Sequence, residues 1–333
     1  MTNSNLKKLL TEYEKKRLDA LYDAQKRKDQ LYNQIPRLQE IDDILSKEAI
    51  RVSRLMLSSN DPSLLQDLNK KINDLKLEKE QLIKSYGKNI DYLKPIYECS
   101  DCNDTGYITK NYNTTMCHCL KQKLFDIEYN KSNIYNLDKE NFDNFSLDLY
   151  SNEADEQKYN SKLSPRENIE KIKKLSIKFI ENFDNDNEKN LLFTGNTGLG
   201  KSFLSSCIAN ELLKKGKTVL YQTAPIMLDT IIDYRFGKNN TSKELYDSLL
   251  NVDLLIIDDL GTESMNSIKF SELFNIINSR LLNSKNKKTR TIISTNLSLQ
   301  NLFSTYDERI VSRIVGNYNI CYFFGDDIRF KKR

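Results

Sequence analysis

The run from Gly195 to Ser202 reads G-N-T-G-L-G-K-S and matches the phosphate-binding pattern G-x-x-x-x-G-K-[ST] at every fixed position. Residues 189–194 before it (K-N-L-L-F-T) predict a buried strand, and residues 203–214 after it predict a helix. Small residues let backbone N–H groups curl around phosphates, and the helix N-terminus adds partial positive charge there. This strand–loop–helix context distinguishes a nucleotide site from a chance Gly-rich turn. The sequence therefore predicts binding of ATP or GTP.

Each part of this loop has an expected task. The side chain of Lys201 is expected to reach the β- and γ-phosphates, and the Ser202 hydroxyl is expected to hold Mg²⁺. The residues expected to cradle the phosphates are Gly195, Asn196, Thr197, Gly198, Leu199, Gly200, Lys201 and Ser202.

A second half of the nucleotide site follows in the run 252–259, V-D-L-L-I-I-D-D. Continuous hydrophobicity is typical of a parallel strand that is buried on both faces, and open α/β sheets bind ligands at the carboxyl ends of such strands. Asp258 is expected to coordinate Mg²⁺, directly or through water, and Asp259 to orient or deprotonate the attacking water. Aspartate has a shorter reach than glutamate, so we expect slow hydrolysis. The alternative is two acids that merely start a turn.

The composition limits the number of domains, the partners and the location that the chain can have. A chain of 333 residues with 38% hydrophobic residues is long enough for two domains. Its 51 basic and 47 acidic side chains leave a net charge of only +4, which neither requires nor excludes nucleic acid as a partner. Apolar runs fall short of the ~18 residues of a membrane span, and the start, M-T-N-S-N-L-K-K, lacks the apolar core of a signal peptide. A cytoplasmic location is expected.

Four of the six cysteines cluster in the sequence, as Cys99 and Cys102 followed by Cys117 and Cys119. Two thiolates from each of two tight turns, joined by a short hairpin, complete a tetrahedral zinc site. His118, the chain's single histidine, is an alternative ligand in place of one neighbour, and free reduced thiols are the alternative to zinc. The other two cysteines, at positions 207 and 321, fall in patterns that predict core positions.

Three further segments complete the organisation. Residues 1–95 carry leucine and isoleucine at three- and four-residue spacing, which predicts long helices in a coiled hairpin or small bundle. This segment is interpreted as a docking module for a partner, with a plain spacer as the alternative. The zinc module is predicted at 96–125 and a linker at 126–166. From 167 to 333 helices and strands alternate, which predicts an α/β fold, a mainly parallel sheet covered on both faces by helices.

Two later motifs in this last segment carry polar side chains of interest. The strand predicted at 290–295 ends at Asn296, where an amide in nucleotide-reading ATPases senses the γ-phosphate. Residues 307–314, D-E-R-I-V-S-R-I, place Arg309 and Arg313 on one helix face. An arginine that projects from such a helix can reach the nucleotide of a neighbouring subunit, and the alternative is a surface helix with solvated arginines.

Taken with the loop and the acids, the motifs T-I-I-S-T-N-L and D-E-R-I-V-S-R-I resemble the bacterial replicative-helicase loader ATPases, AAA+ proteins related to DnaC and DnaI and to the helper ATPase of some insertion elements. The run 325–329, G-D-D-I-R, fits as well, and the cysteine module resembles the zinc region of the same loaders. The resemblance covers residues 96–333. It implies an AAA+ P-loop ATPase that is preceded by a zinc module and a helical domain.

The resemblance also implies roles. Asp259 is the catalytic acid, Asn296 the first sensor, Arg313 the finger that acts in trans with Arg309 as a substitute, and Arg329 a second sensor. The implied function is ATP-dependent loading of a hexameric replicative helicase onto single-stranded DNA. The segment 1–95 is then the helicase-binding part, and the ATPase part forms homo-oligomers. The alternatives are a transposition helper and a zinc-stapled adaptor whose nucleotide site is only structural.

Overall fold

The computed structural model describes residues 3–58, 62–128, 139–237, 241–284 and 287–332. These residues form two compact units, one of Leu10–Thr115 and one that combines Met1–Leu9 with Met116–Arg333. None of the helices within the described ranges combines the length and the apolar character that crossing a membrane requires. The two units are described separately below.

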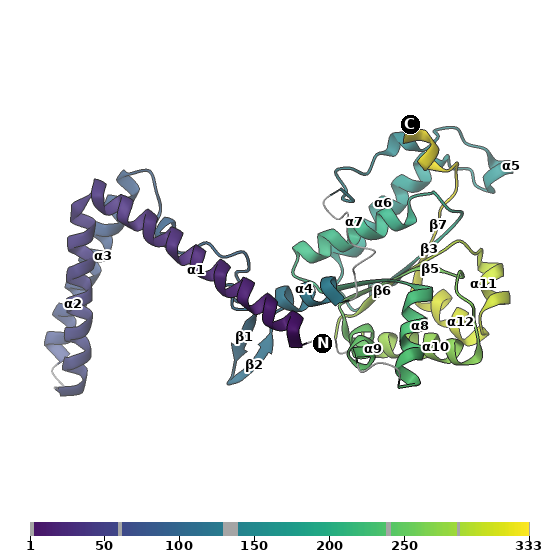
Figure 1. Cartoon of the computed structure of the whole chain (residues 1–333). Helices are drawn as coiled ribbons and strands as arrows, with labels where there is room; N and C mark the ends of the chain where they lie inside the picture. Colours follow the sequence, from purple (N-terminus) through teal and green to yellow (C-terminus); the bar gives the residue numbers. More distant parts are fainter. Residues whose placement is uncertain (1–2, 59–61, 129–138, 238–240, 285–286, 333) are drawn as a thin grey trace. The chain divides into compact units, whose positions relative to one another are not determined.

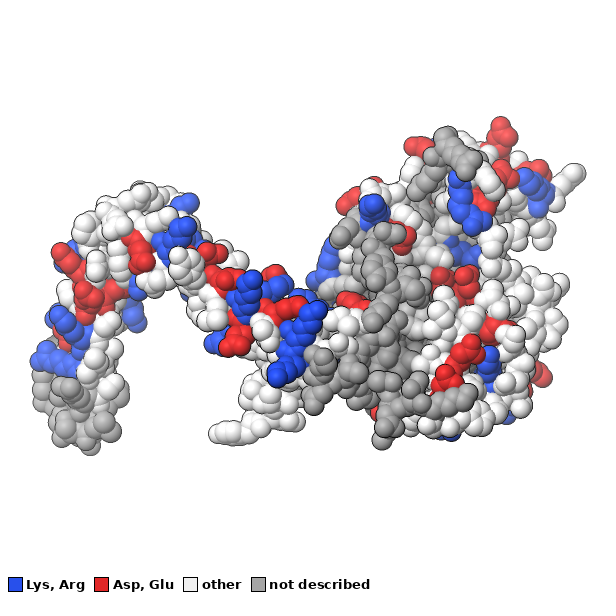
Figure 2. Space-filling view, in the orientation of Figure 1, with Lys and Arg blue, Asp and Glu red and all other residues white. Residues whose placement is uncertain are grey.

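The unit Leu10–Thr115 is built on long helices, α1 (Asn3–Gln34), α2 (Pro36–Ser58) and α3 (Pro62–Ser85). Pro36 opens α2, where the missing N–H of proline costs no helical hydrogen bond. Ion pairs of Arg37 with Glu78 (2.8 Å) and Glu48 with Lys71 (2.6 Å) show that α2 and α3 pack antiparallel. Acidic and basic side chains alternate along these helices (Figure 2).

The same unit ends in a short helical turn, η1 (Ile90–Leu93), and a two-stranded hairpin of β1 (Tyr107–Lys110) and β2 (Asn113–Met116). The two residues between the strands, Asn111 and Tyr112, have φ of 49° and 62°. Positive φ at both positions is the geometry of the tight hairpin turns that match the twist of the strands. The hairpin therefore brings the residues before β1 close to those after β2.

The larger unit has a sheet that contains five strands among the described residues, in the order β4-β5-β6-β3-β7 (Figure 1). Every neighbouring pair is parallel. The strands are β3 (Asn190–Thr194), β4 (Val219–Thr223), β5 (Leu254–Leu260), β6 (Arg290–Thr295) and β7 (Tyr318–Tyr322). Because β3, β6 and β5 are adjacent, the residues that follow these strands meet at one edge of the sheet.

Helices cover both faces of this sheet (Figure 1). Successive strand residues point to opposite faces, so Leu192 belongs to a core shared with α8 and α10, while Phe193 belongs to one shared with α6 and α7. The bounds are α4 (His118–Glu128), α5 (Glu156–Tyr159), α6 (Pro165–Glu181), α7 (Lys201–Lys214), α8 (Ala224–Arg235), α9 (Thr241–Asn251), α10 (Ser267–Asn283), α11 (Leu299–Thr305) and α12 (Glu308–Asn317), with short turns η2 (Leu147–Leu149) and η3 (Ile328–Lys332). The predicted parallel α/β fold is confirmed.

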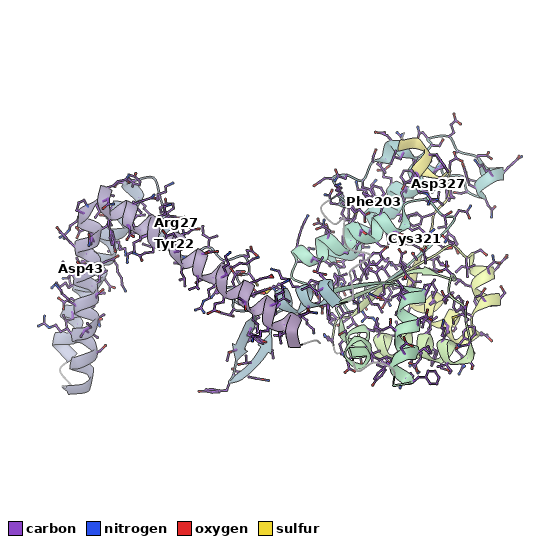
Figure 3. All side chains as sticks on the ribbon, viewed as in Figure 1. Tyr22, Arg27, Asp43, Phe203, Cys321 and Asp327 are labelled. Carbon is purple, nitrogen blue, oxygen red and sulfur yellow. The ribbon has the colours of Figure 1, made fainter. Side chains whose placement is uncertain are left out.

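The predicted linker 126–166 lies partly outside the described residues, at 129–138. Of its described part, Phe145 and Tyr150 are buried in the same core as Phe193. This packing places both residues beside the edge of the sheet that carries the nucleotide motifs. Both cysteines predicted as core residues are also buried, Cys207 on α7 and Cys321 on β7. Figure 3 labels Cys321 on the ribbon.

Candidate functional site

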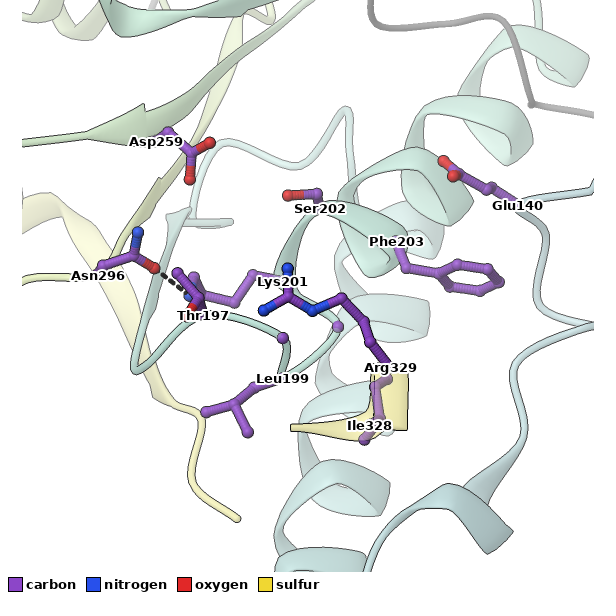
Figure 4. Close-up of a pocket in the computed structure, with 12 residues that line it drawn as sticks. Glu140, Thr197, Leu199, Lys201, Ser202, Phe203, Asp259, Asn296, Ile328 and Arg329 are labelled. Atoms are coloured by element: carbon purple, nitrogen blue, oxygen red, sulfur yellow. Dashed lines mark hydrogen bonds between the residues drawn. The ribbon is translucent and has the colours of Figure 1, made fainter. Parts of the chain in front are cut away.

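A cavity of about 390 Å³ opens at the carboxyl edge of the sheet, above the loop 195–202 (Figure 4). It is lined by residues from the loop, from the ends of β5 and β6, from the C-terminal segment and from the segment before α5. These are Glu140, Thr197, Gly198, Leu199, Gly200, Lys201, Ser202, Phe203, Asp259, Asn296, Ile328 and Arg329. Most of the predicted nucleotide-site residues therefore surround one space.

Lys201 lies at the start of α7 and is 5% exposed. Its ammonium group donates to the carbonyl oxygens of Gly195 (2.6 Å) and Asn196 (2.7 Å) and to Oδ1 of Asn296 (2.7 Å). Burial lowers the pKa of Lys201 to about 8, although the carboxylates of Asp259 and Asp258 oppose the shift. The loop thus holds a cation inside a cavity of a size that suits a small ligand.

Glycine is required in the loop for two reasons. Gly198 has φ of 73° and Gly200 has φ of 88°, a region that side chains with a Cβ rarely adopt. A Cβ at Gly195 would lie 2.1 Å from the carbonyl oxygen of Phe323, and one at Gly200 would lie 2.5 Å from the hydroxyl of Tyr150. Tyr150 also donates to the carbonyl of Leu199 (3.0 Å), so neighbouring elements fix the loop from outside.

Asp258, near the end of β5, is buried and held through both carboxylate oxygens. The Tyr221 hydroxyl of β4 donates to Oδ2 at 2.7 Å, and the Ser294 hydroxyl of β6 donates to Oδ1. Burial raises the pKa of Tyr221 well above its usual range. The predicted Mg²⁺ ligand Asp258 is therefore held by hydroxyl groups from both neighbouring strands.

Asp259 sits in an irregularity of β5, where the pairing with β6 shifts register between Ile257 and Leu260. Its φ is 54°, which turns the carboxylate out of the strand and toward the cavity (Figure 4). Burial raises the pKa of Asp259, the charge of Asp258 adds to the shift, and Lys201 opposes it. A half-buried carboxylate with a raised pKa is a suitable group to accept a proton from water.

The C-terminal segment closes one side of the cavity. The backbone N–H of Ile328 donates to the carbonyl of Gly198 (2.9 Å). Arg329 lines the cavity while its Nε donates to Asp327 (2.9 Å to Oδ1), and this pairing raises the pKa of the guanidinium.

The two arginines of α12 are not among the residues that line the cavity. Nε of Arg313 donates to Oδ1 of Asn278 on α10 (2.9 Å), and its guanidinium lies over the Phe274 ring. Arg309 makes two hydrogen bonds to Asp307 (2.9 Å each), one of them from Nε, and also lies over Phe274. Within one chain the structure therefore does not bring either arginine to the nucleotide site.

The four clustered cysteines are brought together. The sulfur atoms of Cys99, Cys102, Cys117 and Cys119 all lie within 4.8 Å of one another. The Asp104 carboxylate accepts hydrogen bonds from the backbone of Glu98 and Cys99 (2.9 Å each), which shapes the first turn. The His118 ring instead faces Gly216, at 3.3 Å from the position that a Cβ there would take.

Both donor sets fit the ions that the sequence predicts. Four thiol groups around one point are the ligand set of structural zinc sites. Ser202 and Asp258 offer oxygen ligands, which magnesium prefers.

Several residues around the site are absent from the sequence-based prediction. Tyr221 and Ser294 hold Asp258, and Glu140 and Tyr150 lie at the cavity or its loop. Tyr221 is the middle residue of β4 and Ser294 is the last but one of β6, so side chains with a hydroxyl in the strands next to β5 were an available signal. Nothing local marks Glu140 and Tyr150, because their positions depend on how the segment before α5 packs.

Comparison with known proteins agrees with this site. Residues 149–333 match the model of the family described as IstB-like ATP binding protein. The replicative helicase loader DnaC of Escherichia coli (strain K12) is 31% identical over 140 residues, which cover 42% of this chain and 55% of that protein. DnaC of Buchnera aphidicola subsp. Baizongia pistaciae (strain Bp) is 32% identical over 167 residues, 50% of this chain and 66% of that protein. The chain thus spans little more than half the length of the Escherichia coli relative.

Two solved structures of other proteins are similar to part of this chain. The crystal structure of the DnaC helicase loader has a TM-score of 0.42 and 23% identity, and covers 54% of this chain and 96% of that one. The crystal structure of DnaI has a TM-score of 0.39 and 24% identity, and covers 45% and 83%. Since the family match extends over more than half of the 333 residues and contains the whole cavity loop, the chain belongs to the IstB-like ATP binding proteins.

Proposed function

We propose that this protein is an ATPase that loads a hexameric replicative helicase onto single-stranded DNA during replication, in the cytoplasm. The observation that carries the proposal is the cavity that Lys201 of the phosphate loop lines together with Asp259 and Asn296. The similarity to relatives named replicative helicase loaders, at 31% and 32% identity, supports the choice of helicase loading among the tasks of such ATPases.

In this proposal each residue around the cavity has a defined task. The loop amides and Lys201 bind the phosphates, and Ser202 and Asp258 hold Mg²⁺, which neutralises phosphate charge when it is bound. Asp259 orients the attacking water and accepts its proton, and Asn296 senses the γ-phosphate. Arg329 acts as a second sensor from the C-terminal segment.

Arg313 acts in trans in this proposal. Its guanidinium is exposed on α12 and lies outside the cavity of its own chain. A neighbouring subunit then completes the site, because its Arg313 adds transition-state charge stabilisation to that of Lys201 and Arg329 in the cavity. The ATPase unit is therefore proposed to act as a homo-oligomer, with ATP as the switch between assembly and release.

The helical segment 1–95 is proposed to bind the helicase. On α1 the apolar side chains of Leu18, Leu21 and Tyr22 are 59%, 40% and 71% exposed. Their spacing of three and four places them on one helix face, which is the arrangement by which helices bind in protein grooves.

The test is co-purification of the full-length chain with the hexameric replicative helicase of the host in the presence of ATP. We expect a complex with the wild type and its loss in a Leu18→Ser, Tyr22→Ser variant. The matched control is Ile96→Ser, which changes another exposed apolar residue in the same unit and should keep the complex. A wild-type chain that never binds the helicase would overturn the loader proposal. The partner of the ATPase would then have to be another protein, such as a transposase.

A further inference from the structure

We propose that Tyr221 is a positioning residue of the magnesium site, because its buried hydroxyl donates to the Asp258 carboxylate and sets the direction in which this carboxylate presents its oxygen atoms. The inference rests on the proposed ATPase function of the same cavity. It adds a residue from β4, a strand that contributes none of the residues that line the cavity.

The geometry of this connection is set by the sheet. Tyr221 lies on β4 and is the register partner of Ile256 on β5. Ile256 stands two residues before Asp258 in the sequence. Its side chain is 3% exposed, and its Oη donates to Oδ2 of Asp258 at 2.7 Å. Ser294 holds the other carboxylate oxygen from β6. The carboxylate of Asp258 is therefore clamped from both neighbouring strands.

The direction of the protons gives the clamp a chemical consequence. A tyrosine hydroxyl has one hydrogen, and Tyr221 gives that hydrogen to Asp258. The Ser294 hydroxyl gives its hydrogen to the other oxygen of the same carboxylate. Each oxygen of an ionised carboxylate has two lone-pair sites, so this arrangement leaves one on each oxygen of Asp258 available for a cation.

Burying a hydroxyl group at this position costs free energy, and the hydrogen bond to Asp258 offsets that cost. The face of β4 on which Tyr221 lies packs in a core with Phe193, Leu204 and Ile256, where an apolar side chain would fit without a hydrogen-bond requirement. The hydroxyl is retained there and donates to Asp258, a predicted metal ligand. Hydrogen bonds to metal-binding carboxylates orient them, and their removal weakens metal affinity by about 10- to 100-fold.

The experiment compares the full-length wild type with Tyr221→Phe, which keeps the ring and removes the hydroxyl. Each protein is saturated with a non-hydrolysable ATP analogue and titrated with Mn²⁺, and free Mn²⁺ is followed by electron paramagnetic resonance, with Mg²⁺ as competitor. We expect the variant to bind both ions at least about tenfold more weakly. Its affinity for the analogue in the presence of EDTA should equal that of the wild type.

The matched control is Tyr318→Phe, which removes another buried tyrosine hydroxyl, one that lies outside the cavity. Its metal affinity should stay at the wild-type value. If Tyr221→Phe does not fold, Ser294→Ala tests the other arm of the clamp with the same titration and the same expected weakening. Metal affinity within twofold of the wild type in the folded variant would overturn the inference. A wild type that binds no nucleotide would instead overturn the ATPase proposal itself.

Discussion

The ammonium nitrogen of Lys201 lies 2.7 Å from Oδ1 of Asn296, so the phosphate loop after β3 is tied directly to the end of β6. Two backbone carbonyls of the loop take the other hydrogens of the ammonium group. An ammonium group has three donors, and all three are engaged. A bound phosphate must therefore replace some of these contacts, and the release of Asn296 can report that the nucleotide has arrived.

This relationship predicts different effects on binding and on turnover for Asn296→Ala. The variant frees one donor of Lys201, so ATP affinity measured by calorimetry should be equal to that of the wild type or slightly higher. Turnover should fall by about 10²-fold or more, because a polar group that stabilises charge in the transition state is lost. Asn301→Ala, an exposed asparagine on α11, should change neither quantity. Equal losses of binding and turnover would contradict the sensor role.

Asp259→Asn separates nucleotide binding from hydrolysis. The amide keeps the size of the side chain and tolerates the positive φ of this position, but it cannot accept a proton from water. We expect ATP affinity to be kept and steady-state phosphate release to fall by about 10²- to 10⁴-fold. Full helicase loading with this variant would favour the adaptor alternative, in which the nucleotide is only structural.

The trans role of Arg313 is tested by complementation. Arg313→Ala alone should bind ATP like the wild type and lose the turnover that assembly or DNA stimulates, by about 10³-fold or more. Lys201→Ala alone should fail to bind ATP. A mixture of the two variants should regain turnover, because the intact Arg313 of one chain can serve the intact loop of the other. No recovery, or unchanged stimulated turnover in Arg313→Ala, would contradict the assignment.

The zinc prediction is tested by metal content. Purified wild type should hold one zinc ion per chain by mass spectrometry, and Cys102→Ser and Cys117→Ser should lose it, because four thiolates form the set that the structure brings together. His118→Ala should retain zinc, since the His118 ring faces Gly216. Zinc loss in His118→Ala, together with retention in Cys119→Ser, would support the histidine ligand set instead.

The sequence was sufficient for the fold of the ATPase unit because its signals are local. The predicted helix 203–214 and strand 290–295 agree with α7 and β6, since the loop motif marks where the helix begins and β-branched residues mark the strand. The clamp on Asp258 could not be derived in this way. It depends on β4 and β6 lying on either side of β5, and the order of strands in a parallel sheet is set by tertiary packing.

Gly198 lies against the C-terminal segment, so a larger residue at this position should weaken ATP binding. The loss of binding free energy can be divided into two parts. Gly198 has φ of 73°, and a Cβ there would lie 2.1 Å from the Asp327 carboxyl group. Gly198→Ala should therefore weaken ATP binding through the strained backbone and through displacement of Asp327 with its partner Arg329.

The double variant Gly198→Ala, Asp327→Ala removes the steric overlap and leaves the backbone strain, which costs about 1–2 kcal/mol. Calorimetric ATP affinities of the wild type, both single variants and the double variant complete a thermodynamic cycle. We expect the double variant to bind ATP more tightly than Gly198→Ala. Additive effects of the two substitutions would show instead that the C-terminal segment does not restrain the phosphate loop, since independent sites contribute independently to binding.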